Sequence, residues 1–189
     1  MFSHLVLASR SPQRTAILSQ LGIDHEVRPP DAAELEEGDP AAVAVENARR
    51  KALAVDGELV LGVDTVVALD GVVYGKPRDA DHARATLAAL SGATHQVVSG
   101  VALARGRHVE TRSAVTGVTF RALSAAQIEW YVATDEWRER AGGYAIQGRG
   151  AALVEAIEGD FWNVVGLPVP ELLRLAPELA RAPRREGFS

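Results

Sequence analysis

One apolar run, from Leu59 to Tyr74, constrains the fold of this chain more than any other segment. It is long enough for two strands, and Asp70-Gly71 in its middle is a common sequence for a tight hairpin turn. The first part of the run, 59–67, has only Asp64 and Thr65 as polar residues. The segment therefore predicts a hairpin whose first strand is buried.

Strand-like and helix-like segments alternate along the rest of the chain. Strands are predicted over residues 4–8, 23–28, 95–104, 109–120 and 151–157, and helices over 12–21, 40–54, 79–91, 124–133 and 168–175. Ser11, Asp39, Asp79 and Ser124 are the expected N-caps, because each precedes a helical pattern and has a short polar side chain. This order predicts an α/β fold with a mixed twisted sheet flanked by helices.

Composition and length favour one ordinary globular domain. The chain has 189 residues, of which 47% are hydrophobic and 24% charged. We expect a single domain over 1–180 and a flexible tail over 181–189. The absence of cysteine excludes disulfides and a thiolate nucleophile, and it mildly favours a cytoplasmic location.

Charge and hydropathy exclude two classes of partner. No stretch approaches the roughly 20 apolar residues of a membrane span, and the N-terminus lacks the pattern of a signal peptide. The net charge is −5, which disfavours non-specific binding to nucleic acid. A small anionic ligand is still compatible with this charge, because a local basic cluster can outweigh the global sign.

Lysine occupies only two of the twenty Lys and Arg positions, at Lys51 and Lys76. Lysine is a compact point charge and arginine a planar fork, so the two are not interchangeable at a phosphate or a catalytic carboxylate. Chance survival in an arginine-rich composition is the alternative. Lys76 follows Asp64 closely in the sequence, which favours a functional role.

Asp64 places a carboxylate on the buried strand. An unpaired carboxylate there would cost several kcal/mol or stay protonated, so we expect a partner. The candidates are Lys76, a bound cation, and hydrogen bonds from Thr65 and nearby amides. A structural salt bridge is one interpretation, and a metal ligand or general base is the other.

The segment Ser9 to Arg14 has the order strand, small-residue turn and helix N-terminus. Free backbone N–H groups and the helix dipole favour an anion at such a point. Ser9 and Ser11 can add hydroxyl donors, and Arg14 can fold over a phosphate. An ordinary helix start is the alternative, since caps are common and the spacing is not that of a P-loop.

Two further segments could contribute polar groups. In the acidic loop before residue 40, either Asp31 or Glu34 could turn inwards. The segment Gly142 to Gly150 carries four glycines around Gln147, whose amide can read donors and acceptors on a base edge. An irregular connection is the alternative interpretation of this segment.

Taken in order, these segments resemble the Maf family of nucleoside triphosphate pyrophosphatases. The resemblance lies in residues 5–14, 47–52, 62–67, 75–80, 90–97, 143–151 and 159–168. It implies two lobes with a central cleft, and hydrolysis of a nucleoside triphosphate to the monophosphate and pyrophosphate with Mg²⁺ or Mn²⁺.

The resemblance also assigns roles to individual residues. The catalytic acid of the family falls on Asp64, the second acid on Glu34, the two lysines on Lys51 and Lys76, and the phosphate-binding arginine on Arg14. Asp64 and Glu34 are accordingly expected to hold the metal, with Asp64 also helping to remove the proton of the attacking water.

Three positions bear on the base that is recognised. Thr65 and Gln147 fit the pattern of the branch acting on dTTP and UTP, whereas Gln13 departs from it, since that branch has arginine there. We therefore expect a pyrimidine-leaning or broader specificity.

Two alternatives stay open. One is a nucleotide-binding regulator of septum formation without turnover, and the other is a pyrophosphatase for modified purines such as 7-methyl-GTP. A homodimer is compatible with the sequence, which does not fix the oligomeric state.

Overall fold

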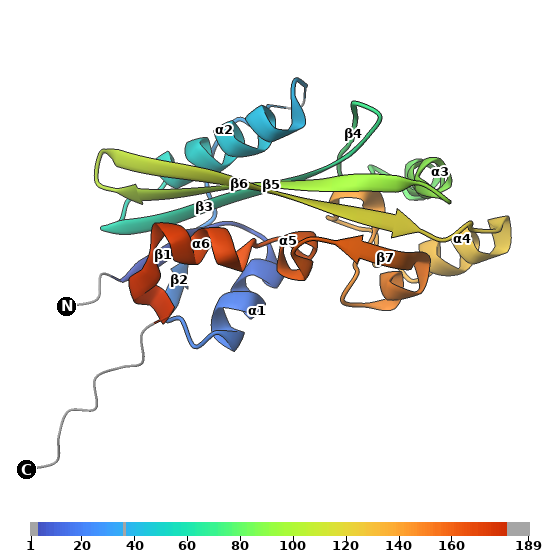
Figure 1. Cartoon of the computed structure of the whole chain (residues 1–189). Coiled ribbons are helices and arrows are strands. Elements are labelled where there is room, and N and C mark those ends of the chain that lie inside the picture. The colour runs from blue at the N-terminus through green and yellow to red at the C-terminus, as the bar shows by residue number, and fades with distance from the viewer. Residues whose placement is uncertain (1–3, 36, 181–189) are drawn as a thin grey trace, which may run out of the picture.

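The computed structural model describes residues 4–35 and 37–180, so the tail expected at 181–189 lies outside the described residues. Its centre is one seven-stranded sheet of mixed direction (Figure 1). The strands are β1 (Leu5–Ala8), β2 (His25–Val27), β3 (Leu59–Leu69), β4 (Val72–Tyr74), β5 (Thr94–Arg105), β6 (His108–Phe120) and β7 (Val154–Glu158). The predicted α/β class is confirmed.

Helices cover both faces of this sheet. They are α1 (Pro12–Gln20), α2 (Pro40–Leu53), α3 (Ala80–Leu90), α4 (Ala125–Val132), α5 (Phe161–Val165) and α6 (Val169–Leu175), with 3₁₀ turns η1 (Ala141–Gly143), η2 (Arg149–Leu153) and η3 (Pro177–Ala180). Within the described residues, no helix combines the length and the apolar character needed to cross a membrane.

Local signals set most of these boundaries. Asp39, Asp79 and Ser124 each accept a hydrogen bond from a backbone N–H three residues later, as the capping prediction requires. Ser11 is an exception, because its hydroxyl donates to Oε1 of Gln13 at 3.0 Å and makes no capping bond. Ser11 is still the N-cap residue and Pro12 the first residue of the helix, as predicted, but the side chain of Ser11 does not cap it.

The predicted hairpin joins β3 to β4. Asp70 and Gly71 have φ angles of 51° and 78°, the left-handed values that a tight two-residue turn demands. The last predicted strand is shorter than expected, because residues 149–153 form η2 before β7 begins. The short helix α5 was not predicted.

Side-chain alternation along the strands places the two helical layers on opposite faces. On one face, Leu61 packs in a cluster with Leu18 of α1 and Leu172 of α6. On the other face, Val60 packs with Ala48 of α2. Figure 1 shows the same arrangement, with α2 on one side of the sheet and α1 and α6 on the other.

Two glycines bring α2 unusually close to the sheet. A Cβ at Gly62 of β3 would collide with the carbonyl oxygen of Ala48, and one at Gly100 of β5 would collide with that of Ala44. The helix can lie this close only because both strands lack a side chain at the contact. One face of α2 is thereby held directly against β3.

The two edges of β3 are paired differently. One edge pairs with β5 over residues 60–68. The other pairs with β1 over residues 59–62 and with β4 over 67–69. Residues 63–66 therefore lie between the two partners, at a point where strand order changes and ligand sites of α/β folds commonly occur.

Candidate active site

One cavity of about 540 Å³ lies at this split edge of β3, and all ten predicted site residues line it. They are Ser9, Ser11, Gln13, Arg14, Glu34, Lys51, Asp64, Thr65, Lys76 and Gln147. The lining comes from the β1–α1 turn, the loop before α2, β3, the segment after β4 and the glycine-rich segment. The structure thus brings together segments that are far apart in the sequence.

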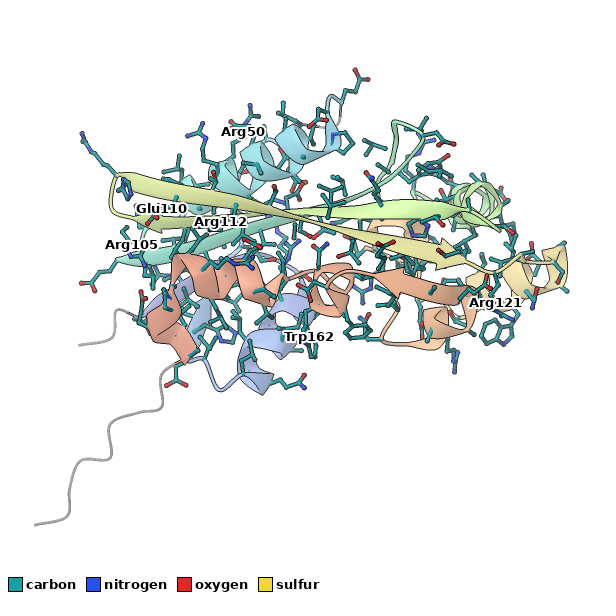
Figure 2. The ribbon with its side chains drawn as sticks, viewed as in Figure 1. Arg50, Arg105, Glu110, Arg112, Arg121 and Trp162 are labelled. Atoms are coloured by element: carbon teal, nitrogen blue, oxygen red, sulfur yellow. The ribbon has the colours of Figure 1, made fainter. Side chains whose placement is uncertain are left out.

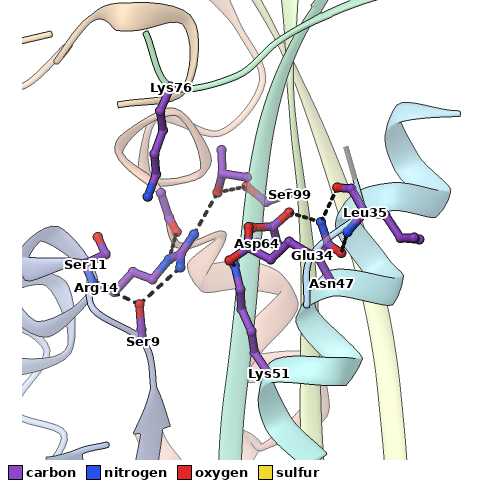
Figure 3. A network of polar contacts seen from close by, with 12 residues as sticks. Ser9, Ser11, Arg14, Glu34, Leu35, Asn47, Lys51, Asp64, Lys76 and Ser99 are labelled. Atoms are coloured by element: carbon purple, nitrogen blue, oxygen red, sulfur yellow. Dashed lines mark hydrogen bonds and ion pairs between the residues drawn. The ribbon is translucent and has the colours of Figure 1, made fainter. Parts of the chain in front are cut away.

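Lys51 is the partner of the lone acid on β3. Its Nζ lies 2.6 Å from Oδ1 of Asp64 and 2.9 Å from Oε1 of Glu34 (Figure 3). Only 10% of the Lys51 side chain and 9% of the Asp64 side chain are exposed. Of the two candidate acids in the loop, it is Glu34 that lines the cavity.

The suggested pairing of Asp64 with Lys76 is wrong. Asp64 occupies an even-numbered position of β3 and so faces α2, whereas Lys76 follows β4 and pairs with Glu139 at 3.0 Å. Lys76 still lines the cavity, and Figure 3 shows its side chain extending toward Arg14 and Ser11.

The two faces of α2 differ in their charges. On its outer face, Arg49 and Arg50 pair with Glu46 at 2.8 and 2.9 Å, and Figure 2 shows Arg50 on that side. Lys51 is buried on the opposite face. The single lysine of the helix is therefore the cation that reaches the cavity.

Asn47 fixes both acids relative to α2. Its amide nitrogen donates to Oδ2 of Asp64 at 3.1 Å and to the carbonyl oxygen of Leu35 at 3.0 Å. Its amide oxygen accepts from the Leu35 N–H at 2.7 Å. The residue after Glu34 is thereby pinned to the helix, as Figure 3 shows.

The environment keeps Asp64 ionised. Burial by itself would raise the pKa of Asp64, but the charge of Lys51 and its hydrogen bond, the charge of Arg14 and the bond from Asn47 together hold this pKa below its ordinary value of 3.8. A carboxylate that is charged at neutral pH can accept a proton or bind a cation.

Arg14 lines the cavity and donates hydrogen bonds to three separate segments of the chain. Its Nε donates to the carbonyl oxygen of Gly166 at 2.8 Å, and its two terminal nitrogens donate to Ser9 at 3.2 Å and to Thr65 at 3.3 Å. Burial lowers the pKa of Arg14, while Asp64 and Glu34 act in the opposite direction. These bonds use three of five N–H donors, so two stay available to a ligand.

The hydroxyls near Arg14 are also fixed. Ser9 Oγ accepts from the N–H of Ser11 at 3.1 Å, and Thr65 Oγ1 shares a hydrogen bond of 2.8 Å with the buried Ser99. Ser99 lies on the neighbouring strand β5, directly opposite Thr65 in the strand register. The two hydroxyls that accept from Arg14, those of Ser9 and Thr65, are therefore each held by a second hydrogen bond.

Two adjacent glycines, Gly142 and Gly143, allow two segments that line the cavity to pack closely against each other. Gly142 donates its N–H to the carbonyl oxygen of Gly75 at 3.1 Å. A Cβ at Gly142 would lie 2.8 Å from Val67, and one at Gly143 would lie 2.9 Å from Pro77. Both glycines have φ of 68°, a conformation that favours glycine. The loop that carries Glu139 is thus fixed to the segment that carries Lys76.

The remaining wall of the cavity is largely apolar. Val67, Val97, Val164, Val165 and Tyr144 line it. The hydroxyl of Tyr144 shares a hydrogen bond of 2.9 Å with Nε2 of the buried His95. The exposed Gln147 lies at the edge of this wall. This wall can accommodate a flat apolar ring whose polar edge contacts the side-chain amide of Gln147.

The donor set fits a divalent cation shared with a ligand. Asp64 and Glu34 supply hard carboxylate oxygens that converge on one ammonium group. Among the described residues, no cluster of three or more His, Cys, Asp or Glu could hold a metal by itself. Mg²⁺ is often held by one or two carboxylates together with substrate phosphates, so two acids are sufficient.

Several residues at the site had no predicted role, namely Asn47, Ser99, Glu139, Arg140 and Tyr144. Asn47 could have been found, because it precedes Lys51 by four residues and so shares its helix face. The other four carry no local pattern, and their roles come from the way the chain folds.

Comparison with known proteins agrees with this geometry. The family model described as Maf-like protein matches residues 4–179. A dTTP/UTP pyrophosphatase of Anaeromyxobacter sp. (strain Fw109-5) is 52% identical over 182 residues, which cover 93% of this chain and 89% of that protein. Proteins of the same description from Pyrococcus furiosus and Thermus thermophilus are 46% and 47% identical, over 90% of this chain and over 93% and 92% of those proteins. The chain therefore belongs to the Maf family.

Proposed function

We propose that this protein hydrolyses dTTP or UTP to the monophosphate and pyrophosphate in the cavity at β3. The lining of this cavity carries the proposal. Six cationic side chains and three carboxylates line it, in a chain whose net charge is −5. Such a local excess of positive charge attracts a polyanion and raises its rate of association. The names of the relatives supply the choice of nucleotide.

The phosphate chain is assigned to the β1–α1 turn, the first turn of α1 and the two lysines. Arg14 retains free N–H donors, Ser9 and Ser11 add hydroxyls, and Lys51 and Lys76 approach from other segments. Their charges would stabilise the negative charge that develops on the departing pyrophosphate.

Asp64 and Glu34 are the proposed ligands of Mg²⁺ or Mn²⁺. When bound, such an ion neutralises charge on the phosphates and polarises their bonds. The spacing of the two carboxylates supports this assignment, because both lie within contact distance of one cationic group, the ammonium of Lys51.

In the proposed reaction, Asp64 accepts a proton from the attacking water. The water oxygen forms a new bond to phosphorus, the bond between the α and β phosphates breaks, and pyrophosphate leaves. Lys51 can exchange Asp64 for a phosphate oxygen when the nucleotide binds.

The base is assigned to the apolar wall beside Gln147 and Thr65. A Gln amide presents one acceptor and two donors, which suits the alternating carbonyl and N–H groups of uracil and thymine. Gln13 also lines the cavity, where its side-chain oxygen accepts from Ser11. The amide nitrogen of Gln13 stays available to a substrate, in place of the arginine expected from the dTTP/UTP branch.

A substrate panel tests the proposal. Pyrophosphate release would be measured with dTTP, UTP, CTP, ITP and 7-methyl-GTP, each with Mg²⁺ and with Mn²⁺. The largest kcat/KM is expected for dTTP and UTP. A preference for 7-methyl-GTP would contradict the base assignment, and nucleotide binding without any release of pyrophosphate would favour a regulator without turnover.

A further inference from the structure

Arg140 has a polar group that the protein itself does not satisfy. It precedes η1 and lines the cavity with a half-buried side chain. Its Nε is buried, and among the described residues this atom has no hydrogen-bond acceptor. A buried donor without an acceptor is rare in a folded protein and commonly marks the place of a water or an ion.

The nearby acids are engaged elsewhere. Glu139 pairs with Lys76 at 3.0 Å, and Glu136 accepts the backbone N–H of Arg149 at 2.8 Å. Burial lowers the pKa of Arg140, and the attraction of Tyr131, Glu136 and Glu139 opposes this only in part. The guanidinium is therefore partly desolvated without a paired carboxylate, which is unfavourable unless an anion binds.

The position of Arg140 is also fixed by its surroundings. Gly142, two residues later, donates to Gly75, which immediately precedes Lys76. The clash that a side chain at Gly142 or Gly143 would cause shows how closely the two segments pack. Arg140 and Lys76 are thus held on two segments that contact each other, and both line the same cavity as Arg14 of α1.

We propose that Arg140 is a further substrate-binding residue, which grips the pyrophosphate part of the nucleotide through its guanidinium fork. The inference rests on the proposed function. Lys76 must exchange Glu139 for a phosphate, whereas Arg140 has an unused donor and needs no such exchange. A planar fork can also contact two phosphate oxygens at once, which an ammonium group cannot do in the same geometry.

Its neighbour Arg138 does not share these properties. Arg138 pairs with Asp135 at 2.9 Å, and its guanidinium carbon lies 4.4 Å from the centre of the Trp137 ring. The protein itself therefore supplies Arg138 with both an ion-pair partner and an aromatic ring to stack on. The contrast between two arginines on one loop is what singles out Arg140.

Calorimetric titration of the full chain with inorganic pyrophosphate in the presence of Mg²⁺ tests this inference without requiring turnover. Arg140→Gln is expected to weaken pyrophosphate binding about tenfold or more, and to leave the affinity for UMP unchanged. Arg107→Gln is the matched control, because it removes the same charge from an exposed turn outside the cavity. Equal pyrophosphate affinities for wild type and Arg140→Gln would overturn the inference.

A second variant covers the case in which Arg140→Gln does not fold. Arg140→Lys keeps the charge and removes Nε, and it is expected to bind pyrophosphate several-fold more weakly than wild type. If Arg140→Lys bound pyrophosphate as tightly as wild type, the proposed contact through the guanidinium group would be overturned. These outcomes are separate from the proposed function, which fails if the wild-type protein releases no pyrophosphate from dTTP or UTP.

Discussion

The ammonium group of Lys51 lies 2.6 Å from the carboxylate of Asp64, and this buried ion pair joins α2 to the central strand β3. It explains how an acid can be tolerated on a buried strand beside a cavity. It also places a positive charge at the wall of the cavity, where a phosphate can become its partner. The first prediction concerns this pair.

Replacing Lys51 by Gln should move the acid limb of the pH–rate profile. In wild type the pKa of Asp64 is held below its ordinary value, so protonation of Asp64 should not contribute to the acid limb of kcat/KM above that value. Without Lys51, burial raises this pKa, and activity should be lost at a higher pH. The profile is measured with dTTP, and Arg50→Gln on the outer face of α2 is the control. Superimposable profiles for wild type and Lys51→Gln would contradict the account.

Asn47→Ala should destabilise the protein by about 2–3 kcal/mol, because Leu35 loses the side-chain partner of its N–H and C=O and Asp64 loses a donor. Urea unfolding followed by circular dichroism measures the change. Glu46→Ala, on the exposed face of the same helix, should cost about 1 kcal/mol or less. A similar cost for both variants would mean that Asn47 does not hold the loop.

His95 should make stability depend on pH between about 6.5 and 4. Burial lowers its pKa from 6.5 to about 4, so the unfolded chain binds a proton that the folded chain excludes. The contribution is complete above pH 6.5 and is lost as pH falls to about 4, with a slope of up to about 1.4 kcal/mol per pH unit. His95→Gln should flatten this part of the stability curve. An unchanged slope in the variant would refute the assignment.

Gly142→Ala should destabilise the fold by about 1–3 kcal/mol more than Gly106→Ala. Both glycines have positive φ, 68° and 60°, so both substitutions strain the backbone. Only at Gly142 would the new methyl group meet Val67, at 2.8 Å, whereas nothing lies within 4 Å at Gly106. Thermal unfolding of the two variants measures the difference. Equal losses would show that Gly142 is not closely packed against Val67.

Much of this fold could be predicted from local sequence. The caps at Asp39, Asp79 and Ser124 and the hairpin at Asp70-Gly71 depend on residues that are adjacent in the chain, so their signals can be read directly. Helix boundaries followed from these signals. The turn η2 was missed because it has no side-chain cap, and α5, although capped by Asp160, spans only five residues and is too short to show a helical period.

The site was predicted as a set of residues, and its internal contacts were not. The partner of Asp64 depends on which face of β3 the carboxylate occupies and on how closely α2 packs at Gly62. Nearness in sequence suggested Lys76, which in fact pairs with Glu139. The unused donor of Arg140 depends on burial and on how neighbouring acids are engaged, which no local pattern encodes.

The most direct test of the central claim compares pyrophosphate release from dTTP and UTP by wild type and Asp64→Asn. The substitution keeps the shape of the side chain and removes its charge and its ability to accept a proton. The account predicts a loss of about 10²-fold or more in kcat, with normal activity in Asp81→Asn, an exposed acid of α3 outside the cavity. If folded Asp64→Asn released pyrophosphate at the wild-type rate, Asp64 would not be the catalytic acid of this cavity and the account would be wrong.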